Sequence, residues 1–211
     1  MTDLALVRHG ETVWHDENRY AGTTEVALSP RGHEQAEGLA AWARSAGLAA
    51  IWVSPLSRAR ATAAPAARVS GLELRVDRRL RELDFGRGEG LTLREMEERF
   101  PRELRQFRAD PVAHHLPGGE DPREAAERVI ACWYDIARAY PDGRVLIVMH
   151  TTAQRLALCR LIGVPLCEYR RVFPSVIHCA ITEIRLEDGR ASVLRFNAPT
   201  DPSANGGVAG R

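Results

Sequence analysis

The chain has 211 residues, of which 45% are hydrophobic and 27% charged, a composition typical of a soluble globular protein of one domain. Its 29 basic residues nearly balance its 28 acidic ones, so no excess of positive charge indicates nucleic acid as a partner. No apolar run approaches the roughly 20 residues that span a bilayer, and no secretory signal opens the chain. These features argue against a membrane protein and predict a cytoplasmic location.

Two features of the composition limit the chemistry. Every basic residue is an arginine, which excludes lysine nucleophiles and Schiff bases. The cysteines Cys132, Cys159, Cys167 and Cys179 lie in or beside apolar segments without C-x-x-C spacing. Reduced, partly buried thiols are therefore favoured over disulfides or a zinc site.

In the first half of the chain, two predicted strands are each followed by a polar segment and then by a predicted helix. Leu4 to Val7 is typical of a buried strand and ends at Arg8-His9-Gly10, and Ser29-Pro30 predicts the start of a helix that runs to about Ser45. Ile51 to Val53 predicts a second strand, after which Ser54-Pro55 indicates the start of a helix that carries Arg58.

The second half supplies shorter elements and then a third strand-to-helix junction. Leu72 to Val76 and Leu80 to Leu83 favour short extended segments, and Leu91 to Phe100 favours a helix that Pro101 interrupts. The clearest elements follow: helix Pro122 to Ala139, strand Arg144 to Met149, helix Thr152 to Ile162, and a hairpin of Ala180 to Leu186 with Ala191 to Phe196. The glycine-rich tail 199–211 is predicted to be disordered.

Alternating strands and helices predict a three-layer α/β/α sandwich with a mostly parallel central sheet, formed as one domain by residues 1–198. Ligands of such sheets bind at the carboxyl ends of the strands. Arg8, His9, Arg58 and His150 all follow predicted strands, so they are expected to converge at one edge. Guanidinium groups beside imidazoles, without a cluster of acidic residues, are typical of a phosphate pocket rather than a metal site.

Ordered motifs around these residues resemble those of a known family. They are Leu6-Val7-Arg8-His9-Gly10-Glu11-Thr12, Asn18 to Gly22, Val53 to Ala59, Leu80 to Gly86 with Glu89 to Thr92, Pro117 to Glu120, and Val145 to His150. Together they resemble the histidine phosphatase superfamily, in its phosphoglycerate mutase-like branch. The resemblance implies the phosphoglycerate mutase-like fold and hydrolysis of a small phosphorylated metabolite.

The resemblance also implies a role for each matching residue. His9 would be the nucleophile that carries the phosphoryl group, while Arg8, Arg58 and His150 would hold the phosphoryl oxygens. Glu82 would be the proton donor, with Asp84 as its competitor. Gly22 and Thr151 would complete the substrate-binding set. This chemistry requires no metal and no cofactor.

At some positions the chain departs from the family pattern. His15 stands where an asparagine is usual, Thr151 where a glycine is usual, and Gly88 where an aromatic side chain is common. Thr151 offers a hydroxyl to the phosphate but leaves less room for the substrate, so it is expected to shape specificity.

The segment 100–120 is expected to cover the mouth of the site. Its basic residues are Arg102, Arg105, Arg108, His114 and His115, which form either a solvated face or a set of specificity residues. Adjacent histidines rarely share a metal, so a site of His114 and His115 with Asp110 is not favoured.

Hydrolysis is favoured over mutase-type phosphoryl transfer, the main alternative, because a short cover admits water more readily. A phosphate-binding module and a metal-dependent hydrolase are further alternatives. The sequence identifies neither the alcohol part of the substrate nor the oligomeric state, which leaves a monomer or a homodimer.

Overall fold

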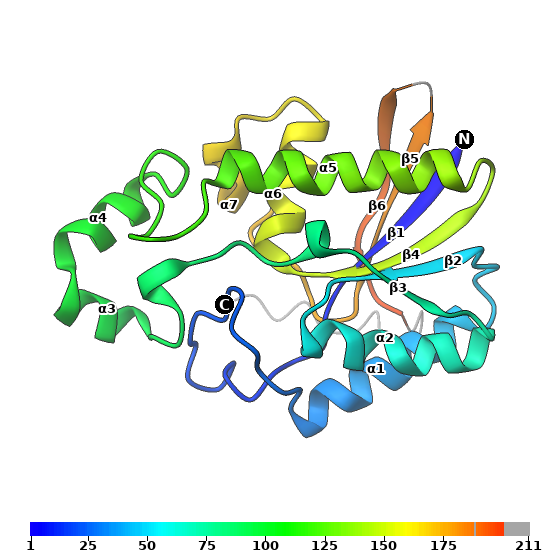
Figure 1. Ribbon diagram of the computed structural model, residues 1–211, viewed down its shortest axis with the longest axis horizontal. Coiled ribbons are helices and arrows are strands. Elements are labelled where there is room, and N and C mark those ends of the chain that lie inside the picture. The colour runs from blue at the N-terminus through cyan, green and yellow to red at the C-terminus, as the bar shows by residue number, and fades with distance from the viewer. Residues whose placement is uncertain (188, 201–211) are drawn as a thin grey trace.

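The computed structural model describes residues 1–187 and 189–200, which build an α/β fold around one mixed sheet (Figure 1). The strands are β1 (Thr2–Arg8), β2 (Ala50–Val53), β3 (Leu74–Val76), β4 (Arg144–Met149), β5 (Ile181–Glu187) and β6 (Arg190–Ala198). Their order in the sheet is β3-β2-β4-β1-β5-β6. Neighbours from β3 to β1 pair in parallel, whereas β5 pairs antiparallel with both β1 and β6. The predicted mostly parallel sheet is confirmed, and so is the hairpin at its end.

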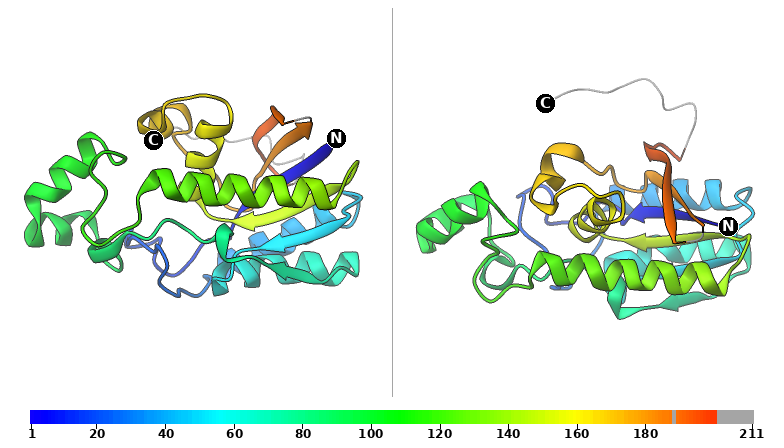
Figure 2. Two further views of the ribbon diagram at one scale, coloured as in Figure 1. Left: turned by 45° about the horizontal axis from the view of Figure 1, so that its top comes forward. Right: turned by 90° about the horizontal axis from the view of Figure 1, so that it is seen from above.

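Helices cover both faces of the sheet, which confirms the three-layer sandwich (Figures 1 and 2). One face carries α1 (Pro30–Ala43) and α2 (Ser57–Ser70), and the other carries α5 (Pro122–Ala139) and α6 (Thr151–Leu161). Two short helices, α3 (Leu93–Arg99) and α4 (Pro101–Ala109), lie at one end of the molecule, and α7 (Tyr169–Val172) follows α6.

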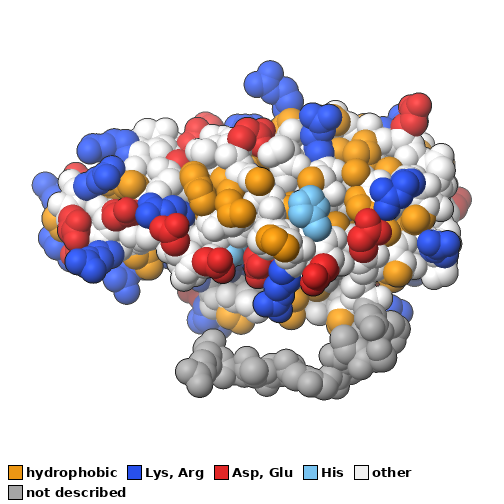
Figure 3. Space-filling view, turned by 90° about the horizontal axis from the view of Figure 1, so that it is seen from below, with side chains coloured by type: hydrophobic (Ala, Val, Ile, Leu, Met, Phe, Trp, Pro, Cys, Tyr) orange, Lys and Arg blue, Asp and Glu red, His pale blue; other side chains and the backbone are white. Residues whose placement is uncertain are grey.

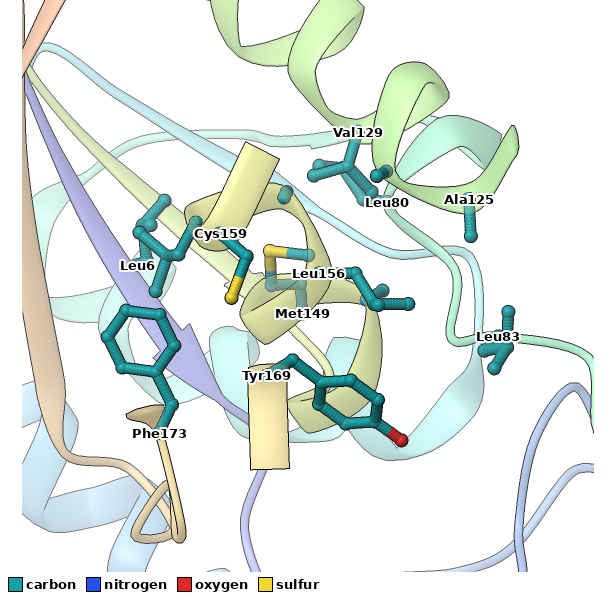
Figure 4. Close-up of a cluster of buried hydrophobic side chains, with 14 of the residues drawn as sticks. Leu6, Leu80, Leu83, Ala125, Val129, Met149, Leu156, Cys159, Tyr169 and Phe173 are labelled. Atoms are coloured by element: carbon teal, nitrogen blue, oxygen red, sulfur yellow. The ribbon is translucent and has the colours of Figure 1, made fainter. Parts of the chain in front are cut away.

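Successive side chains of the central strands point to opposite faces of the sheet, so the hydrophobic core has two parts, one on each face. Leu4 and Leu6 of β1 pack with the side chains of α5 and α6, whereas Ala5 and Val7 pack with those of α1 and α2. Figure 4 shows part of the first cluster, in which Met149 of β4, Leu156 of α6 and Tyr169 of α7 lie close together. This packing fixes where β1 and β4 end, and therefore where the residues that follow them lie.

Two local predictions were wrong. Helix α2 begins at Ser57, three residues after the expected cap, and Leu56 occupies its N-cap without a side-chain bond. The Ser54 hydroxyl instead accepts a hydrogen bond from Leu56 N and contacts His150. Leu80 to Leu83 forms no strand, because the sheet already ends at β3, and a 3-10 turn (Arg78–Leu80) precedes an irregular segment.

One face of the molecule carries side chains of every kind. Figure 3 shows acidic, basic and hydrophobic side chains interspersed over it. No helix among the described residues is long and apolar enough to cross a membrane. Three cysteines are buried as free thiols, but Cys167 is exposed, unlike the partly buried thiol that was expected. The prediction of a disordered tail at 199–211 falls almost wholly on residues 201–211, which lie outside the described part of the chain.

Candidate active site

The predicted site residues meet at the carboxyl edge of the sheet. Arg8 ends β1, His9 follows it, and His150 follows β4, the parallel neighbour of β1. The ring centroids of His9 and His150 lie 5.0 Å apart. Arg58, in the first turn of α2, places its Nε 3.3 Å from His9 Nε2.

The His9 ring is held in one orientation. Its Nδ1 lies 2.7 Å from the carbonyl oxygen of Gly10, which fits an N–H donor at Nδ1 and leaves Nε2 unprotonated. Burial, followed by the charges of His150, Arg58 and Arg8, lowers the pKa of His9 well below 6.5. The imidazole is therefore neutral near neutral pH, and Nε2 keeps the lone pair that a nucleophile requires.

Two guanidinium groups flank this ring, those of the partly buried Arg8 and the buried Arg58. Arg8 donates from Nη1 to the carbonyl of Val176 at 2.7 Å and from Nη2 to His15 Nε2 at 2.7 Å, while its Nε has no partner in the described chain. Burial lowers the pKa of Arg8 to about 10, so it remains a cation at neutral pH. Arg58, which is 1% exposed, is likewise without a carboxylate partner among the described residues. Their charge is therefore available to an anion.

A loop with a glycine at its turn holds Arg58. Its Nη2 donates to the Gly22 carbonyl at 2.6 Å and its Nη1 to the Thr24 carbonyl at 2.8 Å. Gly22 has a φ of +23°, and a Cβ there would lie 1.9 Å from Glu89 Oε1. The Glu89 carboxylate in turn accepts hydrogen bonds from the N–H groups of Thr23 and Thr24 at 2.7 and 2.8 Å.

Gly22→Ala is expected to shift this loop and loosen Arg58. We expect the inhibition constant of inorganic phosphate to rise about tenfold and the free energy of unfolding to fall by roughly 1–3 kcal/mol. Gly38→Ala is the matched control, because a Cβ at that position would have its nearest neighbour at an ordinary 3.6 Å. Equal phosphate inhibition of the two variants would contradict this role of Gly22.

His150 and Glu82 complete the site. His150 is fully buried, with Nε2 2.7 Å from the Ser54 hydroxyl and Nδ1 without a partner in the described chain. Glu82 is 5% exposed, and its Oε1 accepts hydrogen bonds from the N–H groups of Leu83 and Ala153, both at 2.8 Å. Its Oε2 accepts from Thr152 N at 2.9 Å. The start of α6 therefore fixes the carboxyl group beside the histidines.

These groups line one pocket of about 380 Å³. Among its lining residues are all the predicted ones except the buried His150: Arg8, His9, Gly22, Arg58, Glu82 and Thr151. The competitor Asp84 does not line it, because its Oδ1 accepts a hydrogen bond from Gly86 N at 2.7 Å. A buried neutral imidazole among guanidinium groups, with a carboxyl group nearby, is suited to transfer of an anionic group to nitrogen.

Comparison with known families identifies the chain. The model of the "Histidine phosphatase superfamily (branch 1)" matches residues 4–199. The chain belongs to this superfamily.

Two relatives resemble the chain over most of their length. It is 30% identical to "Phosphoserine phosphatase 1" of Hydrogenobacter thermophilus, covering 93% of this chain and 92% of the relative. It is 33% identical to "Probable phosphoglycerate mutase GpmB" of Salmonella paratyphi B, covering 90% and 87%.

Solved structures of the superfamily share the fold. Bacillus stearothermophilus YhfR has a TM-score of 0.88 at 27% identity and covers 94% of this chain and 98% of its own. A mycobacterial glucosyl-3-phosphoglycerate phosphatase in complex with VO3 has a TM-score of 0.84 at 26% identity, covering 93% and 98%.

The pocket of this chain also has lining residues that the sequence motifs did not reveal, chiefly Arg155, Tyr169 and Arg170. Arg155 lies one helical turn beyond Thr151 on α6, a spacing that could have placed it on the same side. Tyr169 and Arg170 lie on the four-residue helix α7, for which the sequence carries no periodic signal.

The segment 100–120 approaches the pocket only indirectly. Arg102, Arg105 and Arg108 are exposed, and no described residue of this segment lines the pocket. Its buried Phe107 packs on Tyr20, with ring centroids 6.2 Å apart, and beneath the guanidinium of Arg170 at 4.7 Å. The residues described contain no group of three or more His, Cys, Asp or Glu that could hold a metal ion.

His178 joins the histidines around the site from the segment before β5. Its Nδ1 lies 2.8 Å from the carbonyl oxygen of His9, and its ring centroid lies 4.5 Å from that of His15. Burial, aided by the charge of Arg8, lowers the pKa of His178 from 6.5 to about 3. His178 is therefore a half-buried, neutral neighbour of the nucleophile.

This depressed pKa predicts an effect on acid stability. Below pH 6.5 the unfolded chain binds a proton at His178 that the folded chain binds only near pH 3, so stability falls as the pH falls through this window. His178→Gln is expected to reduce that slope by up to about 1.4 kcal/mol per pH unit, measured by urea unfolding between pH 7 and 5. His33→Gln, on the exposed side of α1, is the control. An unchanged slope in the His178 variant would refute the assignment.

Proposed function

We propose that the chain is a metal-independent phosphatase that hydrolyses a small phosphate monoester through a phosphohistidine intermediate. The observation that carries this proposal is the neutral His9, whose Nε2 is unprotonated and lies 3.3 Å from the Arg58 guanidinium. The unprotonated nitrogen of the nucleophile accepts a long hydrogen bond from Arg58 Nε, and so lies beside a positive charge that a phosphate would share.

The proposed first step transfers the phosphoryl group to nitrogen. His9 Nε2 attacks phosphorus, the P–N bond forms, and the bond from phosphorus to the ester oxygen breaks. Glu82 gives a proton to that departing oxygen, so that an alcohol rather than an alkoxide leaves. Both groups line the same pocket.

The proposed second step returns the site to its starting state. Water attacks the phosphohistidine while Glu82 takes a proton from it, the P–N bond breaks, and inorganic phosphate leaves. Arg8 Nε and His150 Nδ1 are buried and have no hydrogen-bond partner among the described residues, so both are suited to bind the phosphoryl oxygens in each step. Arg8 and Arg58 supply the positive charge that magnesium supplies in kinases.

Relatives support a small metabolite as the substrate. Those named above include phosphatases of phosphoserine and of glucosyl-3-phosphoglycerate, and a pocket of about 380 Å³ accommodates compounds of this kind. We also propose that Gly22 and Thr151 contact the substrate and that residues 1–198 fold as one domain.

Similarity to a protein named as a mutase supports one alternative, phosphoryl transfer between positions of a phosphoglycerate. Phosphate release from a panel of monoesters, measured with EDTA present, decides between the two. Hydrolysis predicts stoichiometric release of phosphate from at least one ester. Isomerisation of 3-phosphoglycerate without release would identify a mutase, and activity that disappears with EDTA and returns with a divalent ion would refute the metal-independent mechanism.

A further inference from the structure

Two arginines of the pocket lie beyond the residues to which the proposed function gives a role. Arg155 on α6 and Arg170 on α7 are both half-buried and line the same pocket as His9. Arg155 is close enough to both Arg8 and Arg170 for their positive charges to interact. Positive charge in this pocket therefore extends beyond the two guanidinium groups beside the nucleophile.

Neither arginine has a carboxylate partner among the described residues. Arg155 donates only to the carbonyl of Phe173, at 3.0 Å, and its buried Nε has no partner in the described chain. Arg170 donates only to the Tyr169 hydroxyl, at 2.9 Å. By contrast, Arg19, which also lines the pocket, is paired with Glu17 at 2.7 Å and Glu95 at 2.8 Å.

The described lining of the pocket holds too few carboxylates to neutralise its arginines. Glu82 alone is acidic there, and its charge acts on Arg8 and Arg58 as well as on Arg155. Half-buried like charges repel each other and are costly without a counter-charge, so an anion that reaches both arginines gains more than it would at the open surface.

Aromatic rings hold both guanidinium groups in place before any ligand binds. The Arg155 guanidinium lies 5.1 Å from the Tyr169 ring centroid, and that of Arg170 lies 4.7 Å from the Phe107 ring centroid. Tyr169 and Phe107 are themselves buried. Fixed guanidinium groups lose little conformational entropy when they bind an anion, which is typical of a built recognition site.

We propose that Arg155 and Arg170 form a second anion subsite, which binds a negatively charged group on the alcohol part of the substrate while His9 reacts with the phosphate. This inference rests on the proposed function and narrows its substrate to phosphate esters that carry a second anion. A carboxylate and a second phosphate share the required chemistry, and the experiment distinguishes them.

Pairs of esters that differ in one anion provide the test. O-Phosphoserine is compared with O-phosphoethanolamine for the carboxylate, and fructose 1,6-bisphosphate with fructose 6-phosphate for the second phosphate. The readout is the ratio of kcat/KM within each pair, measured for the wild type, Arg155→Met and Arg170→Met. Because each ratio comes from a single protein, partial loss of folded enzyme cancels out.

Matched controls come from the same two helices. Arg160 on α6 and Arg171 on α7 are 57% and 75% exposed, are paired with Glu127 and Glu168, and do not line the pocket. Arg160→Met and Arg171→Met should keep the wild-type ratios. Arg155→Lys should retain part of the selectivity, because it keeps the charge but loses the planar fork.

The wild type is expected to favour the ester with the extra anion by about tenfold or more in one pair, which identifies the anion. Each pocket substitution should lower that ratio about tenfold. Turnover with both kcat/KM ratios near one in the wild type would contradict the subsite, and so would a ratio that both substitutions leave unchanged. Either result would leave the proposed phosphatase function standing. If the wild type hydrolyses no ester, p-nitrophenyl phosphate included, the proposed function fails. The subsite is then tested by calorimetry, as the ratio of the binding affinities for phosphoserine and phosphoethanolamine in the wild type and in the two pocket variants.

Discussion

His9→Ala is expected to abolish phosphate release, with kcat falling by at least about 10⁴-fold. Alanine removes the nitrogen that forms the P–N bond, and no neighbouring group can replace it. In the proposed mechanism His150 contacts Ser54 through Nε2 and donates from Nδ1 to the phosphoryl group, so it has no lone pair that faces phosphorus. The nearby guanidinium groups cannot act as nucleophiles because they remain protonated. The measurement is phosphate release from p-nitrophenyl phosphate in EDTA, together with acid-quenched labelling from a substrate with radioactive phosphorus.

The labelling experiment shows whether the His9 variant is inactive because it lacks the nucleophile or because its pocket is damaged. The wild type should carry an acid-labile phosphoryl group on His9, and the variant should carry none. His33→Ala is the matched control, since this histidine is exposed on α1 and does not line the pocket. Full activity in the His9 variant, or label on another residue, would remove His9 from its proposed role.

The convergence of the site could be predicted from the sequence because it follows from topology. β1 and β4 are central, apolar and parallel, so the residues directly after them lie side by side at one edge of the sheet. His9 and His150 follow these strands, and an unbroken apolar run makes each strand recognisable in the sequence. The pairing of β1 with β4 itself was visible only in the structure.

Contacts between distant segments could not be predicted in this way. Ser54 follows a strand and precedes a proline, which is the local pattern of a helix cap, but its hydroxyl contacts His150, 96 positions along the chain. Gly88 stands where the family commonly has an aromatic side chain. Leu116 and Met96 fill the space beside it, and a Cβ at Gly88 would lie 2.5 Å from Leu116 Cδ1. Neither contact leaves a local signal in the sequence.

The sequence also could not predict which basic residues outside the motifs line the pocket. Arginines of segment 100–120 were considered as specificity residues because of their number, but Arg102, Arg105 and Arg108 are exposed to solvent. Arg155 and Arg170 line the pocket instead, at positions that are ordinary in the sequence. Charge density along the chain does not determine which charges become buried, because burial depends on tertiary packing.

Glu82→Gln is expected to slow the first chemical step by roughly 10²- to 10⁴-fold for an alkyl phosphate and to leave phosphate binding intact. The amide is almost isosteric but cannot give a proton to the departing oxygen. One oxygen can still accept from Leu83 and Ala153, whereas the amide NH₂ would face Thr152 N. That lost hydrogen bond is expected to cost about 1–3 kcal/mol of stability, which a folded chain tolerates.

Comparing esters with different leaving groups shows whether the Glu82 variant is slow because it lacks a proton donor or because its pocket is displaced. p-Nitrophenolate leaves without protonation, so the variant should hydrolyse p-nitrophenyl phosphate far better, relative to wild type, than it hydrolyses an alkyl ester. A displaced pocket would slow both esters equally and weaken inhibition by inorganic phosphate. Asp84→Asn is the control, because Asp84 bonds to Gly86 N and does not line the pocket. Were Asp84→Asn, and not Glu82→Gln, to show the leaving-group dependence, the proton donor would be Asp84.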